Sequence, residues 1–379
     1  MRSIHTIGHS IVLSVTAILA PAVAGDTLHV PADYPLIQEA IDAAGAGDEI
    51  ILAPGVYTDS FAFKEDHVVV RSAEGPSKTI IDGSGAMAYA LAYFPPFSSG
   101  ELHGVTFRNH DHPYTGAVTI KRCVATVADC IFEDNRNYFT GSAVRIDSIS
   151  VGDTFEVEVR GCTFRRNESS DWGGALSASM WNGDDLRIAD CLFEDNTSGG
   201  GGHALLAPNG PGGRIVVEQC TFRSGSGDEV AGVFIVNEGI NAEGFNDVDL
   251  LGCTFEDHEG VGVHVQGEVH LTLDGDVFRN TGAPAVALVW PSAADVADTS
   301  FCASGWADVS GSWTDLGGNT FSDSCDCPGD GNGDGQVSAD DLLGLLAAWG
   351  TDAVDWDFDA NGTVDVADLL LLVAAWGMC

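Results

Sequence analysis

Positive charge is scarce in this chain of 379 residues. Lys and Arg number 16 against 56 Asp and Glu, which gives a formal net charge of -40. Such an acidic surface repels nucleic acid and anionic lipid, so neither is expected as a partner. It also disfavours a polyanionic substrate unless cations bridge the two. The acidity by itself is typical of a soluble protein or of a salty habitat.

Long apolar runs are missing as well. The one pronounced run, Ile11–Ala20, follows Arg2 and precedes the small residues Ala22 and Ala24. A membrane-spanning helix needs about 20 apolar residues. The pattern therefore predicts a signal peptide over 1–24 rather than an anchor, and we expect a secreted or surface-attached protein without direct membrane insertion.

The middle of the chain repeats one phrase. ADCLFEDN at Ala189–Asn196 returns as EQCTFRSG at Glu218–Gly225 and as LGCTFEDH at Leu251–His258. Regular self-similarity indicates a solenoid or a propeller, and a propeller blade needs about 40–45 residues. The solenoid is favoured because the phenylalanine of the phrase recurs at intervals of about 28 residues. It occurs at Phe107, Phe132, Phe164, Phe193, Phe222, Phe255, Phe278 and Phe301.

Alternation within each repeat predicts strands rather than helices. Leu186 and Ile188 lie two residues apart before Cys191, and side chains at every second position line one face of a strand. A second short apolar run, such as Val263–Val265, follows each phenylalanine after a corner rich in Asn and Gly. Asn and Gly suit corners because they tolerate left-handed backbone angles. Two or three short strands per repeat describe one coil of a parallel β-helix, which makes the fold class mainly β.

The segment Thr27–Tyr57 predicts a cap for this solenoid. It contains a strand (Thr27–Val30), a short amphipathic helix (Leu36–Ala44) and a second strand (Glu49–Ala53). A solenoid needs a cap because an open end exposes strand edges and core. The segment closely resembles the N-terminal cap of the pectin-lyase-like, right-handed parallel β-helix superfamily, and the resemblance extends to Phe301. It implies the fold strongly and the chemistry weakly, since that superfamily holds lyases, glycoside hydrolases, epimerases, esterases and adhesins.

The cysteines of the repeated phrase occupy one position of the coil and should stack inside it. Neighbouring coils lie about 4.8 Å apart, whereas the Cβ atoms of a disulfide are about 3.8 Å apart. We therefore expect buried free thiols that act as small hydrophobes, with metal binding or redox chemistry as the alternative. Cys123 has no obvious partner, and the five stacked residues are Cys130, Cys162, Cys191, Cys220 and Cys253.

The outward positions of the strand before each Cys-x-Phe align into two columns. The first contains Glu156, Asp185, Arg214, Asp247 and His270, and the second contains Glu158, Arg187, Val216, Asp249 and Thr272. Two carboxylates roughly 6.5–9.5 Å apart suit an inverting glycosidase, and an Arg suits the base of a lyase. The alternative is a solvated face on which opposite charges pair weakly. We take the candidate substrate face to be Asp185, Arg187, Arg214, Asp247 and Asp249.

Known catalytic signatures of the superfamily are incomplete here. Gly201-Gly202-His203 resembles the Gly-His-Gly of polygalacturonase-like hydrolases, but Ala204 follows it, and neither their Arg-Ile-Lys nor the Arg-x-Pro-x-x-Arg of pectate lyases occurs. Trp172, Trp181 and Trp290 suit sugar stacking or plain packing. Whether the β-helix is catalytic stays open: a deep cleft with facing carboxylates favours an enzyme, and a flat face with paired charges favours an adhesin.

The last segment, Cys327–Cys379, contains a duplicated unit, in which Gly329–Gly350 matches Trp356–Gly377. Each copy has oxygen-bearing side chains at alternating loop positions, Gly at position 6 and Asp at position 12, which is the pattern of an EF-hand calcium loop. The segment has no Lys, Arg, Glu or His to balance its Asp residues, so it needs cations to fold. The predicted ligands for two Ca²⁺ ions are Asp330, Asn332, Asp334, Gln336 and Asp341 in the first loop, and Asp357, Asp359, Asn361, Thr363 and Asp368 in the second.

Each loop lacks an entering helix and leads into a short Leu-rich helix that ends in Ala-Ala-Trp-Gly. This loop-helix duplication resembles a type I dockerin, which implies docking onto a cohesin-type partner through the helices and loop positions 10 and 11. Those positions hold Ala339-Asp340 and Val366-Ala367, where cellulosomal dockerins often have Ser-Thr, so the partner is not identified. Dockerin termini lie close together, which implies a disulfide between Cys327 and Cys379.

The predicted organisation is thus a signal peptide (1–24), a right-handed parallel β-helix (25–326) closed by a Cys302–Cys325 disulfide, and a dockerin-like module (327–379). The leading hypothesis is a secreted component of a polysaccharide-processing system, either a glycoside hydrolase or a polysaccharide lyase. The alternative is a non-catalytic carbohydrate-binding, adhesin or surface-structural protein anchored by the module.

Overall fold

The computed structural model describes residues 25–378 apart from 86–87, 149–153, 182, 209–212, 228–229, 238–245, 259, 283, 304–307, 323–324, 326–328, 333–335 and 360. The predicted signal peptide, the ligand Asp334, the side chain of Gln336 and the predicted Cys327–Cys379 bond lie outside the described residues. In the part of the chain that is described, no helix is both long and apolar enough to cross a membrane.

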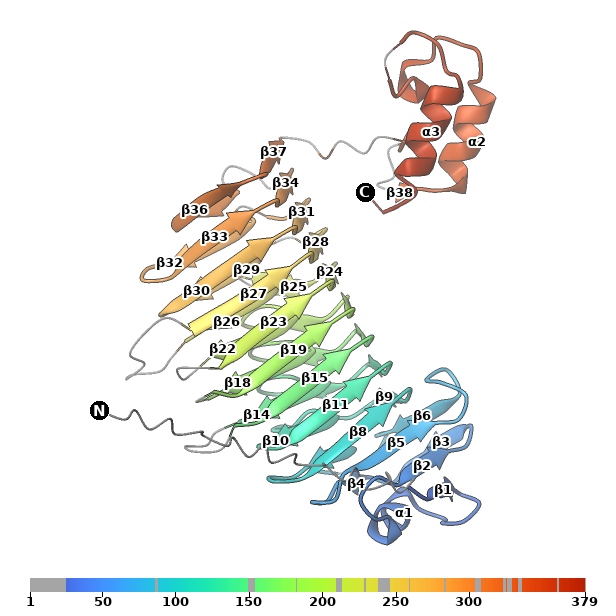
Figure 1. Cartoon of the computed structure of the whole chain (residues 1–379), viewed down its shortest axis with the longest axis vertical. Helices are drawn as coiled ribbons and strands as arrows, with labels where there is room; N and C mark the ends of the chain where they lie inside the picture. The colour runs from blue at the N-terminus through green and yellow to red at the C-terminus, as the bar shows by residue number, and fades with distance from the viewer. Residues whose placement is uncertain are drawn as a thin grey trace, which may run out of the picture.

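Three parallel sheets form the faces of a solenoid, which Figure 1 shows as coils stacked from α1 (Ile37–Ala43) at one end to β37 at the other. Sheet A contains β1 (Thr27–Val30), β2 (Glu49–Leu52), β5 (Val68–Ser72), β8 (Ser99–His103), β11 (Val124–Ala128), β15 (Glu156–Arg160), β19 (Asp185–Ala189), β23 (Arg214–Glu218), β27 (Asn246–Leu251), β30 (Val269–Asp274), β33 (Ala293–Ala297) and β36 (Ser312–Gly317). Sheet B contains β3 (Gly55–Tyr57), β6 (Thr79–Asp82), β9 (Thr106–Arg108), β12 (Ile131–Glu133), β16 (Thr163–Arg165), β20 (Leu192–Glu194), β24 (Thr221–Arg223), β28 (Thr254–Glu256), β31 (Val277–Arg279), β34 (Ser300–Cys302) and β37 (Thr320–Ser322).

Sheet C forms the third face and completes each coil before the chain returns to sheet A. It contains β4 (Phe61–Ala62), β7 (Ala92–Phe94), β10 (Val118–Lys121), β14 (Val144–Asp147), β18 (Leu176–Met180), β22 (Ala204–Pro208), β26 (Val230–Val236), β29 (Val261–Gln266), β32 (Val286–Val289) and β35 (Val309–Ser310). A small sheet lies at the corner between sheets B and C and contains β13 (Arg136–Asn137), β17 (Glu168–Ser169), β21 (Thr197–Ser198) and β25 (Ser226–Gly227).

The repeated phenylalanine holds the coils in register. Phe164, Phe193 and Phe222 are paired one coil apart on sheet B and are buried. Their rings stack with centroids 4.6 Å apart at both steps, close to the strand spacing of about 4.8 Å. The mainly β, right-handed parallel β-helix predicted from the recurrence of this residue is confirmed.

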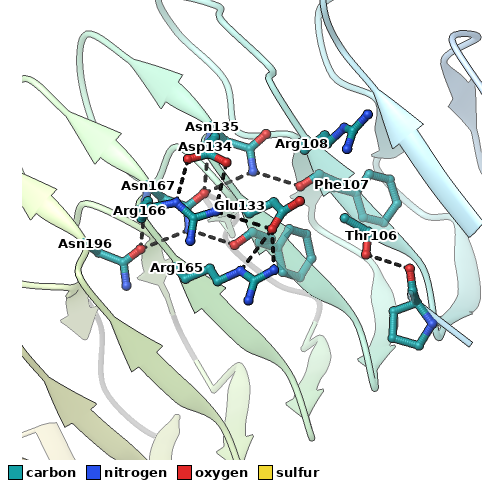
Figure 2. Close-up of polar contacts among 12 residues, drawn as sticks. Thr106, Phe107, Arg108, Glu133, Asp134, Asn135, Arg165, Arg166, Asn167 and Asn196 are labelled. Carbon is teal, nitrogen blue, oxygen red and sulfur yellow. Dashed lines mark hydrogen bonds and ion pairs between the residues drawn. The ribbon is translucent and has the colours of Figure 1, made fainter. Parts of the chain in front are cut away.

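The corner that follows sheet B is built from side-chain amides. Asn135 donates from Nδ2 to the Oδ1 of Asn167 over 3.0 Å, and Asn167 does the same to Asn196 over 2.9 Å. Figure 2 shows these amides beside the strands of sheet B. The residue before Asn196, Asp195, takes a φ of 53°, which short polar side chains tolerate better than most. The amides satisfy buried backbone groups that a sharp corner would otherwise leave unpaired.

The outer face of sheet B carries a ladder of alternating charge. Glu133, Arg165, Glu194, Arg223, Glu256 and Arg279 are consecutive partners in its register. Arg165 donates from Nε to the Oε2 of Glu133 over 2.9 Å, and Arg166 bonds Asp134, as Figure 2 shows. Because a shift by one coil would place like charges together, the ladder favours the observed pairing of coils.

The C-terminal end of the solenoid carries a disulfide. It joins Cys302 on β34 to Cys325, beyond β37, and so ties the last strand of the solenoid back to the preceding coil. The five stacked cysteines are buried free thiols, as the sequence predicts, and Cys123, whose pairing the sequence leaves open, is a buried free thiol as well. Cys220 donates from Sγ to the carbonyl oxygen of Ile188 in the preceding coil, and its thiol therefore satisfies a backbone group as well as filling space.

The C-terminal module is a pair of short helices, α2 (Ala339–Ala347) and α3 (Val366–Ala374), with β38 (Gln336–Val337) paired antiparallel to β39 (Gly377–Met378). A short 3-10 helix precedes the second loop at Val354–Trp356. The C-terminal module has a small core of its own, whose buried residues are Val337, Leu345, Val364 and Leu372. Figure 1 shows the module beyond the β37 end of the stack.

Candidate functional site

The predicted charged face lies on sheet A with the predicted register. The first column pairs in the order Glu156, Asp185, Arg214, Asp247 and His270, and the second in the order Glu158, Arg187, Val216, Asp249 and Thr272. The structure thus brings all five candidate residues of the substrate face onto neighbouring strands.

Both arginines on this face pair with carboxylates, whereas Asp185 accepts the backbone N–H of Arg214 over 3.1 Å and Asp247 lies 3.9 Å from His270. Arg187 forms ion pairs with both Glu158 and Glu218, and the hydrogen bond to Glu218 is the main reason why its pKa is raised. Arg214 lies 2.5 Å, Nη2 to Oδ2, from Asp249. The depression over these strands has a volume of about 260 Å³. The depression on sheet A is therefore small, and both of its arginines already have carboxylate partners.

A larger groove lies on sheet C. The sequence did not predict this groove. Its volume is about 540 Å³. On β14 the buried residues Val144 and Ile146 alternate with the half-buried Arg145 and Asp147, so the latter two face outward. The groove is lined by Thr140, Arg145, Asp147, Asp171, Trp172, Ser177, Ser179, Leu205, Ala207, Phe234, Val236 and Gln266.

The floor of the groove is hollow because its middle residues are small. The register of sheet C places Ser177 on β18 between Arg145 on β14 and Leu205 on β22, and Ser179 next to Asp147. A hydroxymethyl side chain reaches less far from the sheet than the long side chains on either side. The step in side-chain size across adjacent coils therefore produces the depression.

The wall of the groove comes from the turn between β17 and β18. Bridges from Trp172 to Thr140 and to Gly201 hold this turn against the turns of the neighbouring coils. The indole stacks on Phe234 with centroids 4.6 Å apart. It also lies over Gly200, where an added Cβ would come within 3.0 Å of the ring. Glycine at position 200 therefore leaves room for the indole of Trp172 to pack closely against the turn of the next coil.

Two carboxylates reach the groove from different elements. Asp147 on β14 accepts from Arg145, whose Nε lies 3.0 Å from its Oδ2, and Arg145 also donates to the carbonyl oxygen of Tyr114 over 3.1 Å. Asp171 lies on the wall beside Trp172, and burial raises its pKa. One carboxylate is thus held beside a guanidinium, while the other is in surroundings that disfavour its charge.

The second predicted calcium loop brings three carboxylates together. Single oxygens of Asp357, Asp359 and Asp368 lie within 4.8 Å of one another, and Asp368 is fully buried. Asp368 also accepts from the backbone N–H of Asp365 over 2.7 Å, which completes the capping box of α3. Hard carboxylate oxygens converging in a loop fit Ca²⁺. In the first loop, Asp341 closes the matching capping box of α2.

The helices of the module expose equivalent apolar residues. Leu343 on α2 and Leu370 on α3 are 63% and 65% exposed and occupy the same position in the two copies of the duplicated unit. Each is followed by further exposed apolar residues at matching positions. These are Leu346 and Trp349 in the first copy, and Val373 and Trp376 in the second. A module this small gains nothing in its own core from these side chains, so they are available for a partner.

A signal for the groove was present in the sequence. The second apolar run of each repeat has outward positions that align as readily as those of the first, and that alignment would have placed Arg145 beside Ser177 and Asp147 beside Ser179. Trp172 was noted as a possible sugar platform, but its place in the wall depends on contacts with the next two coils. Sequence spacing does not report those contacts.

Several solved structures are similar to this chain at low sequence identity. The catalytic domain of a GH87 α-1,3-glucanase in complex with tetrasaccharides is 11% identical with a TM-score of 0.37, and the match covers 80% of this chain and 71% of that one. The A-module of the mannuronan C-5 epimerase AlgE6 of Azotobacter vinelandii is 13% identical with a TM-score of 0.34, covering 75% and 91%. The PL6 family alginate lyase AlyGC is 14% identical with a TM-score of 0.32, covering 78% and 51%.

A comparison with curated proteins finds no match. The profile of the right-handed β-helix region family matches residues 96–301, which is more than half of the chain. The coil order, the parallel sheets and this match agree, and the chain belongs to the right-handed β-helix family.

Proposed function

We propose that the protein binds a polysaccharide in the groove on sheet C. The single observation that carries this proposal is the groove of about 540 Å³ with Trp172 in its wall and Ser177 and Ser179 in its floor. An indole offers an apolar face to the C–H groups of a sugar ring, while hydroxyl, carboxylate and guanidinium groups bond its hydroxyls. Aromatic walls with a few placed polar groups are the usual chemistry of such sites.

A glycan array followed by affinity electrophoresis of the full chain in calcium tests this proposal. Trp172→Ala removes the platform and is expected to weaken binding roughly tenfold. The matched control is the double variant Asp185→Asn/Asp247→Asn on sheet A, which should bind as the wild type does. Loss of binding in the control with full binding by Trp172→Ala would return the site to the sheet A face.

A second candidate function is hydrolysis of the bound glycan, favoured by the raised pKa of Asp171. In this reaction Asp171 gives its proton to the glycosidic oxygen as the C–O bond breaks. A water molecule attacks the anomeric carbon and passes a proton to Asp147, which Arg145 holds in place. The products are two shorter chains, one with a new reducing end, and no oxidant or cofactor is consumed.

Release of reducing ends from the polysaccharide found on the array tests the second candidate. Asp171→Asn should abolish the release while leaving binding intact, because the amide keeps the shape and loses the proton. Products that absorb in the ultraviolet would instead indicate elimination by a lyase. Binding without any turnover by the wild type would leave a carbohydrate-binding or adhesin function.

The C-terminal module anchors the β-helix in this proposal. Ca²⁺ is held by Asp357, Asp359 and Asp368 with Asn361 and Thr363 in the second loop, and by Asp330, Asn332, Asp334, Gln336 and Asp341 in the first. The exposed side chains Leu343 and Leu370 support docking onto a cohesin-type module, with the signal peptide supporting secretion. Bound calcium neutralises carboxylates that otherwise repel one another, and so it holds the two helices in a docking geometry.

Chelation of the full chain tests the anchor. Removal of calcium with EDTA should lower the helical circular dichroism and abolish binding to a panel of immobilised cohesin-type modules, and added Ca²⁺ should restore both. Leu343→Asp/Leu370→Asp should abolish the docking but keep the calcium-dependent signal. Docking that survives both EDTA and the double variant would contradict this assignment.

A further inference from the structure

An aromatic shelf continues from the groove along the same side of the solenoid. It is formed by Tyr89, Tyr114 and Phe139, which are 45%, 60% and 46% exposed. Tyr114 and Phe139 stack with ring centroids 5.2 Å apart, and Tyr89 packs edge to face on Tyr93 of β7 at 5.6 Å. Large exposed aromatic side chains in a row mark a binding surface more often than they mark packing.

The shelf and the groove are one surface. Phe139 directly precedes Thr140, which lines the groove and bridges to Trp172. Arg145 in the groove donates from Nη1 to the carbonyl oxygen of Tyr114 in the shelf. The surface therefore extends over the sheet C strands from β7 to β29. Six steps of about 4.8 Å make it roughly 29 Å long, which is the length of several sugar units.

The charge of this surface argues against an acidic ligand. Arg145 pairs with Asp147, and Lys121 is held against the shelf because its Nζ donates to the hydroxyl of Tyr89 over 2.7 Å. The carboxylates Asp147 and Asp171 line the groove itself. A glycan with a carboxylate or sulfate on each unit would meet these acids on a chain of net charge -40.

We propose that the groove and the shelf together bind one linear, uncharged polysaccharide chain that runs along the solenoid axis. This inference rests on the proposed function of the groove. Trp172 holds one part of the chain, while Phe139 in the adjacent coil and Tyr114 two coils away hold the sugar units that follow. Affinity therefore increases with chain length until the shelf is filled.

Calorimetric titration of the full chain tests the inference with two panels of probes. The neutral panel contains β-1,4-gluco-, β-1,4-xylo- and β-1,3-gluco-oligosaccharides of increasing length, and the acidic panel contains polygalacturonate and alginate. The variant Tyr114→Ala/Phe139→Ala should lose roughly tenfold in affinity for the long neutral oligomers and nothing for the shortest that bind. Phe97→Ala, an aromatic residue of similar exposure in the turn after β7, is the matched control and should bind as the wild type does.

The results separate this inference from the function on which it rests. Affinity that is independent of length, or tighter for polygalacturonate or alginate than for any neutral oligomer, overturns the inference while the groove remains a glycan site. Binding that Trp172→Ala leaves unchanged, or no binding to either panel, overturns the proposed function as well. Circular dichroism and the melting temperature of each variant establish that it is folded.

Discussion

Acid should destabilise the β-helix through histidines that are buried inside its corners. The corner position that holds Asn135, Asn167 and Asn196 in three successive coils is occupied by Gly225 in the next coil and by His258 in the one after that. His258 has its Nδ1 3.3 Å from the backbone N of Gly225. It is 3% exposed, and burial lowers its pKa from 6.5 to about 4. His110 occupies the same corner position in the coil before Asn135. It is 1% exposed, and burial lowers its pKa to about 4 in the same way.

The sign of the effect follows from where the protons bind. A depressed pKa in the folded state means that the unfolded chain holds more protons between pH 6.5 and 4. The stability due to each neutral histidine is complete above pH 6.5 and is lost as the pH falls toward 4. Because one pKa unit is worth about 1.36 kcal/mol, each histidine contributes roughly 3 kcal/mol to the loss.

The measurement is urea unfolding at a series of pH values between 7.5 and 4, with the free energy of unfolding of the wild type and of His258→Asn compared at each. Asparagine is the residue that the chain itself uses at three equivalent positions, Asn135, Asn167 and Asn196. Burial raises the pKa of Glu256 and Asp276, which work in the opposite sense over the same range. The difference between variant and wild type cancels both.

Between pH 7 and 4, the free energy of unfolding of His258→Asn should fall by roughly 3 kcal/mol less than that of the wild type. His29→Asn, a substitution of an exposed histidine on β1, is the control and should leave the difference at zero. A difference curve for His258→Asn that is flat with pH would refute the account of the buried imidazole.

Three further predictions concern the wall of the groove, the disulfide at the C-terminal end of the solenoid and the C-terminal module. Gly200→Ala places a Cβ within 3.0 Å of the Trp172 indole; it should weaken glycan binding severalfold with little change in melting temperature, and unchanged affinity by calorimetry would contradict the role of the wall. Reduction of the Cys302–Cys325 bond opens a loop of 23 residues and should lower the free energy of unfolding of the last coils by about 3 kcal/mol. Hydrogen exchange should then become faster in β34–β37 only. Equally faster exchange throughout the solenoid would contradict a local role of the bond. Asp368→Ala removes a calcium ligand and a helix cap together, and should destabilise α3 by about 1 kcal/mol even in EDTA, beyond the calcium effect that the wild type shows; equal helicity of the two proteins in EDTA would show that the cap contributes nothing.

The repeat carried most of the information about the fold. A phenylalanine that returns once in every coil specifies both the stacking and the register, and the two columns from Glu156 and Glu158 pair as predicted. Cysteine at one position of the coil was likewise sufficient to predict free thiols. These predictions succeed because a solenoid relates sequence spacing to spatial proximity through one constant step.

The site was harder to predict because charge alone does not reveal which face is hollow. Arg187 and Arg214 drew attention to sheet A, yet each is neutralised by acids on neighbouring coils. The groove depends on the small side chain of Ser177 between Arg145 and Leu205, and on a turn that folds Trp172 back over Gly200. Such depth arises from side-chain packing between coils, which a list of polar residues does not report.

The central claim is that the ligand lies on sheet C and not on sheet A. Hydrogen–deuterium exchange of the full chain, with and without the glycan found on the array, tests it most directly. The account predicts slower exchange in the turns at 137–142 and 170–174, which carry Phe139 and Trp172, and no change around Asp185 and Arg214. Protection confined to the sheet A strands β19 and β23 would contradict it.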